Sequence, residues 1–176
     1  MNPTYYDLGN HSETIEIDYE PAKISYEELL DVFWDSHSPT SPPYSIQYKS
    51  AIFYHNEEQK RLAVETKEQQ EIKRGKSIYT EIVPYSRFYL AEDYHQKYAL
   101  RGVWDIVGEL LAMYPDPEDF VNSTAVTRLN GYSGGYGDVD ELRRNLDDFG
   151  LSEMAKETLL KIADRGLRPG CLTPSK

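Results

Sequence analysis

The chain contains 176 residues, 39% of them hydrophobic and 28% charged, and it carries a formal net charge of -11 at pH 7. This length suits one globular domain, or one domain with a helical appendage. The acidic surplus and the lack of a basic cluster argue against a nucleic-acid-binding protein. No apolar run approaches ~18 residues and no basic segment precedes an apolar one, so we expect no membrane span, no signal peptide and a cytoplasmic location.

A strand and a helix are the first elements that the pattern predicts. Residues 14–19 alternate apolar and acidic side chains, which is the period of a half-buried strand, and Pro21 ends the run. Ser25 and Glu28 then have the spacing of a capping box, in which each side chain bonds to the backbone N–H of the other residue. A helix over residues 26–35 follows from this signal.

The middle of the chain alternates loop, strand and helix. Segment 38–44 holds three prolines, which remove hydrogen-bond donors and predict a loop. A cap signature at Asn56 and a stop signal at Gly75 delimit a polar surface helix. Short strands are expected on either side of it, at residues 50–54 and 78–83.

The sequence predicts mostly helices between residues 91 and 164. A helical pattern runs from residue 91 to residue 114, with glycines as possible breaks, and prolines then mark a boundary. The elements expected after that boundary are a short helix at 120–129, a glycine-rich turn at 130–137, and amphipathic segments at 139–148 and 152–164.

Together these elements predict the fold class. Strand, helix, strand, helix, strand are five of the six elements of a split βαβ unit. We therefore predict an α+β fold, a ferredoxin-like α/β roll that lacks its first strand and helix and carries a C-terminal helical extension. The expected domains are a core at 1–98, the extension at 99–165 and a flexible tail at 166–176.

Several ordered segments also carry a resemblance. The start of the chain crowds tyrosines, a histidine and a carboxylate into a loop, and further matches follow as far as residue 98. In this order the segments resemble peptide methionine sulfoxide reductase, type A. They are Asn2-Pro3-Thr4-Tyr5, His11-Ser12-Glu13, Ile24 to Leu30 with Val32-Phe33-Trp34 and His37, Gln47-Tyr48, Phe88-Tyr89, and Ala91 to Tyr98.

The resemblance implies reduction of methionine S-sulfoxide in proteins or peptides, a repair reaction of the oxidative stress response. A thiolate attacks the sulfur, a carboxylic acid protonates the oxygen, and two tyrosine hydroxyls hold that oxygen. By the same resemblance the acid is Glu13 and the two tyrosines are Tyr5 and Tyr48. A carboxylic acid can serve this role at neutral pH when an apolar, enclosed site disfavours its ionised form.

Simpler interpretations exist for each site residue. Taken singly, each of these residues is more often structural than catalytic: Glu13 would be a solvated carboxylate, Tyr5 a surface aromatic residue and Tyr48 a core aromatic residue. The six ordered matches together favour the catalytic interpretation. The resemblance also implies a supporting wall of His11, Tyr94 and Tyr98. No metal site is predicted, because neither the group Glu92, Asp93 and His95 nor the pair His11 and Glu13 has the histidine spacing of a zinc helix.

Cys171 is the only cysteine, so an internal disulfide is excluded. With no base beside it, an exposed cysteine is a poor primary nucleophile. The resemblance suggests instead that Cys171 resolves a sulfenic acid, with thioredoxin or another dithiol as reductant and no bound cofactor. An inert thiol in the tail is the alternative.

Two departures from the family pattern limit the resemblance. Pro43 stands where the family has an aspartate five residues before the tyrosine, and the Gly-Cys-Phe-Trp-Gly nucleophile segment expected upstream of Asn2 is absent. We therefore expect little turnover by this chain alone. It is either a reductase whose recorded start is late, through a misplaced start codon or a selenocysteine codon taken as a stop, or a non-catalytic binder of methionine or its sulfoxide. The third hypothesis is an α+β interaction domain whose function is carried by the helical region 99–165.

Overall fold

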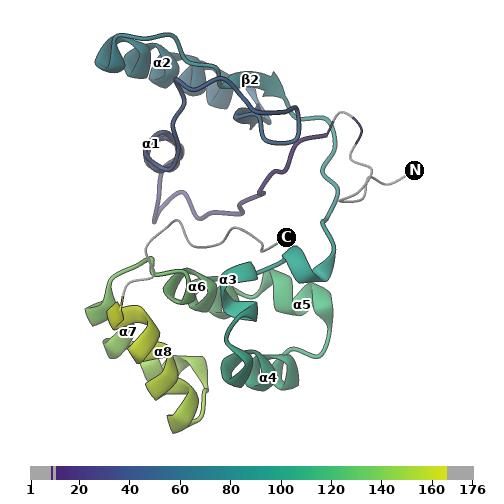
Figure 1. Cartoon of the computed structure of the whole chain (residues 1–176), viewed down its shortest axis with the longest axis vertical. Coiled ribbons are helices and arrows are strands. Elements are labelled where there is room, and N and C mark those ends of the chain that lie inside the picture. The colour runs from purple at the N-terminus through teal and green to yellow at the C-terminus, as the bar shows by residue number, and fades with distance from the viewer. Residues whose placement is uncertain (1–8, 10, 166–176) are drawn as a thin grey trace. The chain divides into compact units, whose positions relative to one another are not determined.

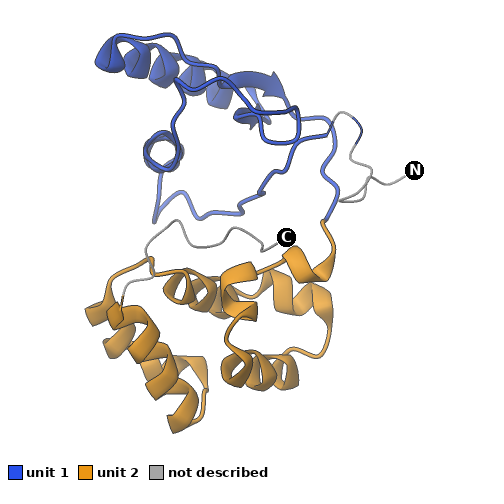
Figure 2. Cartoon of the chain, viewed as in Figure 1, with its two compact units in different colours: residues 1–90 blue, residues 91–176 orange. Residues whose placement is uncertain are grey.

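A computed structural model describes residue 9 and residues 11–165 of the chain. The chain divides into two compact units, residues 1–90 and 91–176 (Figure 2). The described part is mixed α+β and mostly helical, with one parallel pair of strands in the first unit and a set of helices in the second. The predicted α+β class and the C-terminal helices are therefore confirmed. The predicted tail lies outside the described residues.

The first unit is built around a β-α-β segment (Figure 1). Strands β1 (Ala51–Tyr54) and β2 (Glu81–Pro84) pair in parallel, with Ile52 opposite Ile82. Helix α2 (Glu57–Arg74) makes the crossover that parallel strands require. Helix α1 (Tyr26–Asp35) completes the unit. The buried apolar residues of this core are Leu30, Trp34, Ile52, Ala63 and Ile78.

Local capping chemistry sets the ends of both helices, as the sequence predicts. Ser25 accepts from the backbone N–H of Glu28, and the Glu28 carboxylate accepts from the backbone N–H of Ser25 at 2.7 Å. Asn56 caps α2 by accepting from the backbone N–H of Gln59 at 2.9 Å. Gly75 ends α2 with a φ of 62°, a left-handed conformation that glycine adopts without a steric penalty. The helices predicted at 26–35 and between Asn56 and Gly75 are confirmed.

The strand predicted at residues 14–19 is wrong. This segment is coil, and two of its alternating apolar side chains are exposed, Ile15 at 81% and Ile17 at 52%. Alternation describes only the two faces of a strand; a strand also needs a hydrogen-bonding neighbour and an apolar surface to cover. Within residues 11–165, β1 and β2 pair only with each other, and β2 begins at Glu81 rather than at residue 78.

The second unit is helical throughout its described part. The helical pattern predicted from residue 91 to residue 114 is interrupted at Gly102, one of its possible breaks, where one short helix ends before the next begins at Trp104. The glycine-rich stretch is also more helical than predicted, since α6 continues to Ser133. The helices are η1 (Asp93–His95), α3 (Tyr98–Arg101), α4 (Trp104–Met113), α5 (Pro117–Asn122), α6 (Thr124–Ser133), α7 (Val139–Arg144), η2 (Leu146–Phe149) and α8 (Glu153–Arg165).

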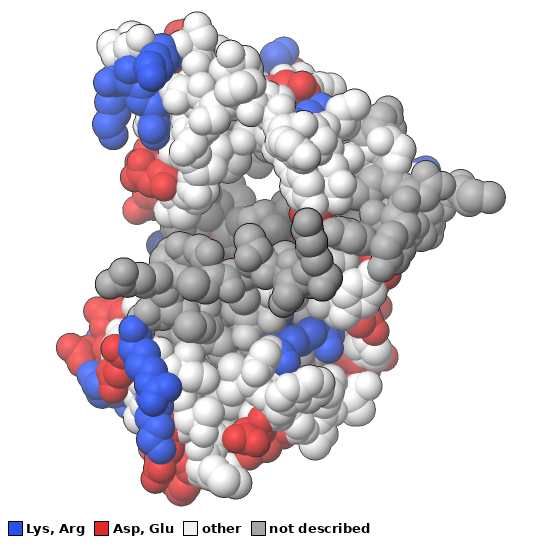
Figure 3. All heavy atoms as spheres, viewed as in Figure 1, with Lys and Arg blue, Asp and Glu red and all other residues white. Residues whose placement is uncertain are grey.

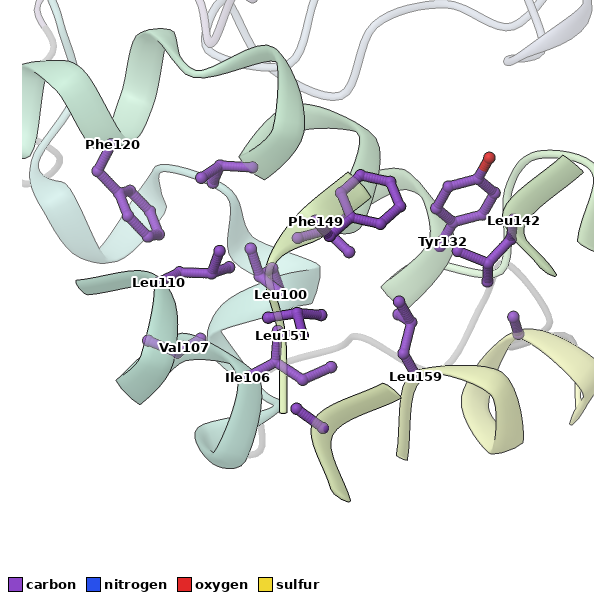
Figure 4. Close-up of a cluster of buried hydrophobic side chains, with 14 residues drawn as sticks. Leu100, Ile106, Val107, Leu110, Phe120, Tyr132, Leu142, Phe149, Leu151 and Leu159 are labelled. Carbon is purple, nitrogen blue, oxygen red and sulfur yellow. The ribbon is translucent and has the colours of Figure 1, made fainter. Parts of the chain in front are cut away.

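These helices enclose a core of their own. Apolar side chains from α3, α4, α5, α6, α7 and α8 converge in the close-up of Figure 4, and all of them come from residues 100–163. Helix α6 packs against α3, α5 and α8, which makes it central to the unit. The fully buried hydrophobic residues are Leu100, Ile106, Leu110, Phe120, Val126, Leu129, Leu142, Ala155 and Leu159. Each unit therefore has a separate hydrophobic cluster.

Charges on the helical unit pair locally. Lys and Arg side chains lie beside Asp and Glu over its surface (Figure 3). Arg143 bridges Asp140 and Asp164, and Lys156 bridges Asp147 and Glu153, at distances between 2.6 and 2.9 Å. Such exposed pairs contribute little to stability. Among the helices described, none is long and apolar enough to cross a membrane.

A hydrogen-bonded carboxylate joins α4 to the start of α8 and makes the stability of this unit depend on pH. The Glu109 carboxylate accepts from the backbone N–H of Ser152 at 2.8 Å and from its hydroxyl. These bonds hold the pKa of Glu109 below its ordinary value of 4.5. Folding therefore favours the ionised carboxylate. Its contribution to the free energy of unfolding is fully present above the ordinary pKa, and it is lost as the pH falls through the lower pKa of the folded state.

We expect the free energy of unfolding to fall more steeply on acidification in the unaltered chain than in Glu109→Gln. Urea unfolding monitored by circular dichroism between about pH 3 and about pH 7 measures this difference. Glu118→Gln, an exposed carboxyl on α5 of the same unit, is the matched control and should keep the unaltered pH dependence. If the free energy of unfolding changed equally with pH in the unaltered chain and in Glu109→Gln, the lowered pKa of Glu109 would be contradicted.

Candidate active site

The segment that carries Glu13 lies against the loop that carries Tyr48. The backbone N–H of Glu13 donates to the carbonyl of Gln47 at 3.0 Å, and the Ser12 hydroxyl donates to the carbonyl of Ile46 at 2.8 Å. Residues 34 positions apart in the sequence are thus joined by backbone contacts. Glu13 and Tyr48, two of the residues that sequence reasoning selected, therefore belong to one local structure.

The Glu13 carboxylate has a defined partner. The side-chain amide of Gln47 donates through Nε2 to Oε1 of Glu13 at 2.8 Å. Glu13 is exposed in this structure, and the apolar enclosure expected around it is not formed by the described residues. Gln47 was not selected from the sequence as a site residue, although it is adjacent to Tyr48 in the matched Gln47-Tyr48 pair.

Tyr48 lies at the end of a short turn beside a surface cavity. Its backbone N–H donates to the carbonyl of Ser45 at 3.3 Å, which tightens the chain just before β1. The ring is 52% exposed and lines a cavity of about 200 Å³ together with side chains from the proline loop. A phenol in this position can donate a hydrogen bond without adding charge.

His11 contacts an aromatic residue that lies far along the sequence. The His11 ring meets the Tyr89 ring edge to face, with centroids 5.3 Å apart. The Arg87 guanidinium donates through Nη1 to the Tyr89 hydroxyl at 3.2 Å, and this bond raises the pKa of Arg87. Sequence reasoning used Tyr89 only as part of the family pattern and did not select Arg87; no local pattern links either residue to His11.

Tyr94 and Tyr98 belong to the helical unit, whereas His11, Glu13 and Tyr48 belong to the first unit. Both tyrosines are about half exposed, and the Tyr94 ring packs against His95 with centroids 4.3 Å apart. Between them, Lys97 donates through Nζ to Thr127 of α6 at 2.7 Å, and burial lowers the pKa of Lys97. Segment 94–98 is therefore anchored within its own unit.

Two further candidates, Tyr5 and Cys171, lie outside the described residues. Within the described ranges no group of three or more His, Cys, Asp or Glu residues is arranged to hold a metal ion. The structure joins Glu13 to Gln47 by a backbone bond and a side-chain bond, and Tyr48 is the next residue of the same loop, so an acid, an amide and a phenol belong to one local structure. This set can hydrogen-bond a polar oxygen and can supply a proton to it.

Comparison with known proteins identifies the family. A family model described as peptide methionine sulfoxide reductase matches residues 1–104, more than half of the chain and all of the first unit. The chain belongs to the peptide methionine sulfoxide reductase family. The recognition made from Glu13, Tyr48 and the other ordered segments is thus confirmed at the level of the family.

Individual relatives agree with this family. The chain is 41% identical over 157 residues to a peptide methionine sulfoxide reductase of Drosophila melanogaster, a match that covers 88% of this chain and 63% of the relative. It is 50% identical over 109 residues to peptide methionine sulfoxide reductase MsrA of Methanosarcina acetivorans, covering 54% of this chain and 57% of the relative. Peptide methionine sulfoxide reductase A5 of Arabidopsis thaliana is 36% identical over 141 residues, and this match covers 75% of this chain and 54% of the relative.

The chain spans less than two thirds of the length of these relatives. The Drosophila match is longer than the 104 residues of the family model, so it extends into the helical unit. At least one member of the peptide methionine sulfoxide reductase family therefore shares sequence with helices of this second unit.

Proposed function

We propose that this chain acts in the thiol-dependent reduction of methionine S-sulfoxide in proteins or peptides. In the net reaction the sulfoxide oxygen passes formally to a thiol, which yields methionine and a sulfenic acid. Two further thiols, from thioredoxin or another dithiol, then restore the first thiol, release water and become a disulfide. Protein repair under oxidative stress is the role that this chemistry would serve.

The contact between the Glu13 segment and the Tyr48 loop carries this proposal. Glu13 is the acid that protonates the departing oxygen, and Tyr48 and Tyr5 hold that oxygen by hydrogen bonds. Gln47 positions the acid, because its amide donates to Oε1 of Glu13 at 2.8 Å and leaves Oε2 to face the substrate. His11, Tyr94 and Tyr98 are proposed as the supporting wall.

The attacking thiol is supplied by a Gly-Cys-Phe-Trp-Gly segment that these 176 residues do not contain. An in-frame codon for that cysteine, or a TGA codon for selenocysteine, is expected upstream of Met1 in the genomic DNA. Cys171 is proposed as a resolving thiol. We also propose that the first unit, with that upstream segment, forms a ferredoxin-like α/β roll and that residues 99–165 are an appended helical extension.

A second candidate function is binding without catalysis. It is favoured by the single cysteine, which lies at position 171, far from the residues that match the family. In this case the chain binds methionine sulfoxide through Glu13, Tyr48 and Tyr5 and reduces none of it, whatever segment is placed upstream.

Calorimetric titration of the chain with N-acetylmethionine sulfoxide amide tests the binding that both candidates require. We expect saturable binding that Glu13→Gln weakens about tenfold, since hydrogen bonds to a charged or acidic group are worth about 1.5 kcal/mol or more. Glu16→Gln, an exposed carboxyl in the same coil, should bind as the unaltered chain does. A folded chain that does not bind the sulfoxide would contradict both candidates.

A further inference from the structure

The cavity beside Tyr48 has an uncharged lining. Three tyrosines and two prolines, Tyr44, Tyr48, Tyr79, Pro42 and Pro43, form much of its wall, and three serines and a histidine complete it. Among the described residues, the lining therefore contains no carboxylate, lysine or arginine. Because a charge that leaves water without a partner is costly, such a cavity disfavours an ionised occupant. The tyrosine and proline rings supply the apolar surface on which an aromatic or apolar side chain can pack.

The volume of the cavity limits what it can hold. At about 200 Å³ it is smaller than the roughly 300–1,000 Å³ of pockets that enclose a whole drug-sized ligand. It is large enough for one amino-acid side chain. The rims are exposed aromatic rings, with Tyr44 at 94% and Tyr79 at 53%. Exposed tyrosines offer a large and rigid contact area at a low cost in conformational entropy.

Hydrogen bonds hold part of the backbone around the cavity before any ligand arrives. The carbonyl of Pro39 accepts from the backbone N–H of Tyr79 at 2.9 Å, which ties the proline loop to the residues that lead into β2. Pro39 is itself buried, and a turn bond from the Ser41 N–H to the Ser38 carbonyl at 3.0 Å follows it. The ring of each proline also fixes its own φ. A backbone that is already ordered reduces the entropy that binding would otherwise lose.

Tyr48 connects this cavity to the candidate active site. It lines the cavity, and it follows Gln47, whose side chain and carbonyl both bond to Glu13. We propose that the cavity receives the apolar or aromatic side chain of a residue next to methionine sulfoxide in a polypeptide. This inference rests on the proposed function, and it adds that the chain selects among oxidised methionines by their neighbours.

Binding of short peptides to the full chain tests the inference. Two peptide series are used, Gly-Gly-Met(O)-Xaa-Gly and Gly-Xaa-Met(O)-Gly-Gly, with Xaa as Phe, Gly, Asp or Lys and with both ends blocked. In one series we expect the Phe peptide to bind about tenfold more tightly than the Gly peptide, which corresponds to partial burial of the ring. The Asp and Lys peptides should bind no more tightly than the Gly peptide.

Two variants separate the cavity from the rest of the surface. Tyr44→Ala should remove most of the preference for Phe, and Pro43→Asp should reduce it and favour the Lys peptide by placing a carboxylate in the wall. Tyr136→Ala, which truncates an exposed tyrosine of the helical unit, is the matched control and should keep the preference. Circular dichroism checks that each variant is folded.

The possible results distinguish this inference from the proposed function. Binding of N-acetylmethionine sulfoxide amide together with equal affinity for the Phe and Gly peptides in both series overturns the cavity assignment alone. A Phe preference that survives in both Tyr44→Ala and Pro43→Asp overturns it as well. Failure of the unaltered chain to bind any methionine sulfoxide overturns both the inference and the function on which it rests.

Discussion

Joined to an upstream segment that carries Gly-Cys-Phe-Trp-Gly, the chain is expected to reduce methionine sulfoxide, and Glu13→Gln is expected to lower its kcat by about a hundredfold or more. Glutamine retains the size of the side chain and a carbonyl oxygen that can still accept from Gln47. It has no acidic proton to give to the departing oxygen. The loss should therefore appear in kcat more than in KM, because the proton is needed in the transition state.

Glu16→Gln provides the control for this experiment. Glu16 is an exposed carboxyl three residues further along the same coil, so its replacement removes an equal charge without touching the contact with Gln47. Turnover by the joined chain is followed with dithiothreitol as the reductant. An equal loss of kcat in the two variants would indicate a general effect of charge and would contradict the role of Glu13. Absence of turnover in a folded joined chain would favour the binding-only function.

Elements governed by neighbouring residues could be predicted from the sequence. The start of α1 depends on Ser25 and Glu28, which are three positions apart, and the limits of α2 depend on Asn56 and on the left-handed Gly75. In each case the residues that make the capping hydrogen bond, or the glycine that adopts the required φ, lie within one turn of the end of the helix. Such signals can be read without knowledge of the tertiary fold.

Elements governed by distant residues could not be predicted in this way. Residues 14–19 have the alternation of a strand, but whether they form one depends on a partner strand that the pattern does not specify. The break between α3 and α4 lies at Gly102, one of the possible breaks that the sequence offers, but the pattern does not say which glycine interrupts the helix. Val103 precedes α4 with a φ of -112° and without a side-chain cap, so the sequence offers no start signal there.

The candidate site illustrates the same distinction. Glu13 and Tyr48 were selected through resemblance to a family, because a separation of some 34 residues carries no local signal of contact. The structure adds the means of contact, a backbone bond and a side-chain bond, both made by Gln47. It also adds the edge-to-face contact of His11 with Tyr89. These contacts depend on how the loops pack, so the local sequence pattern could not predict them.

Adjacent leucines on α4 allow a sharp test of whether the helical unit is stabilised by its own core. Leu110 is fully buried in that core, whereas Leu111 is 44% exposed. Leu110→Ala is expected to lower the free energy of unfolding of the helical unit by about 2–5 kcal/mol, through lost burial and the cavity left behind. Leu111→Ala makes the same chemical change at a site of the same helix that is already partly solvated, so we expect a loss of about 1 kcal/mol or less.

The two units can be followed separately during unfolding. Trp34 is completely buried in the first unit, whereas the other tryptophan, Trp104, is 82% exposed on α4 of the helical unit. All variants are therefore made in a Trp104→Phe background, so that fluorescence reports on the core around Trp34, while more of the helical signal in circular dichroism comes from the second unit than from the first. In Leu110→Ala the midpoint of the helical signal should move to lower urea, and the Trp34 transition should remain where it is in the unaltered chain. Because the buried cluster around Trp34 comes from residues 30–78 and that around Leu110 from residues 100–163, no residue is shared between them. An equal shift of both transitions would contradict this independence and would mean that the two units unfold as one cooperative structure.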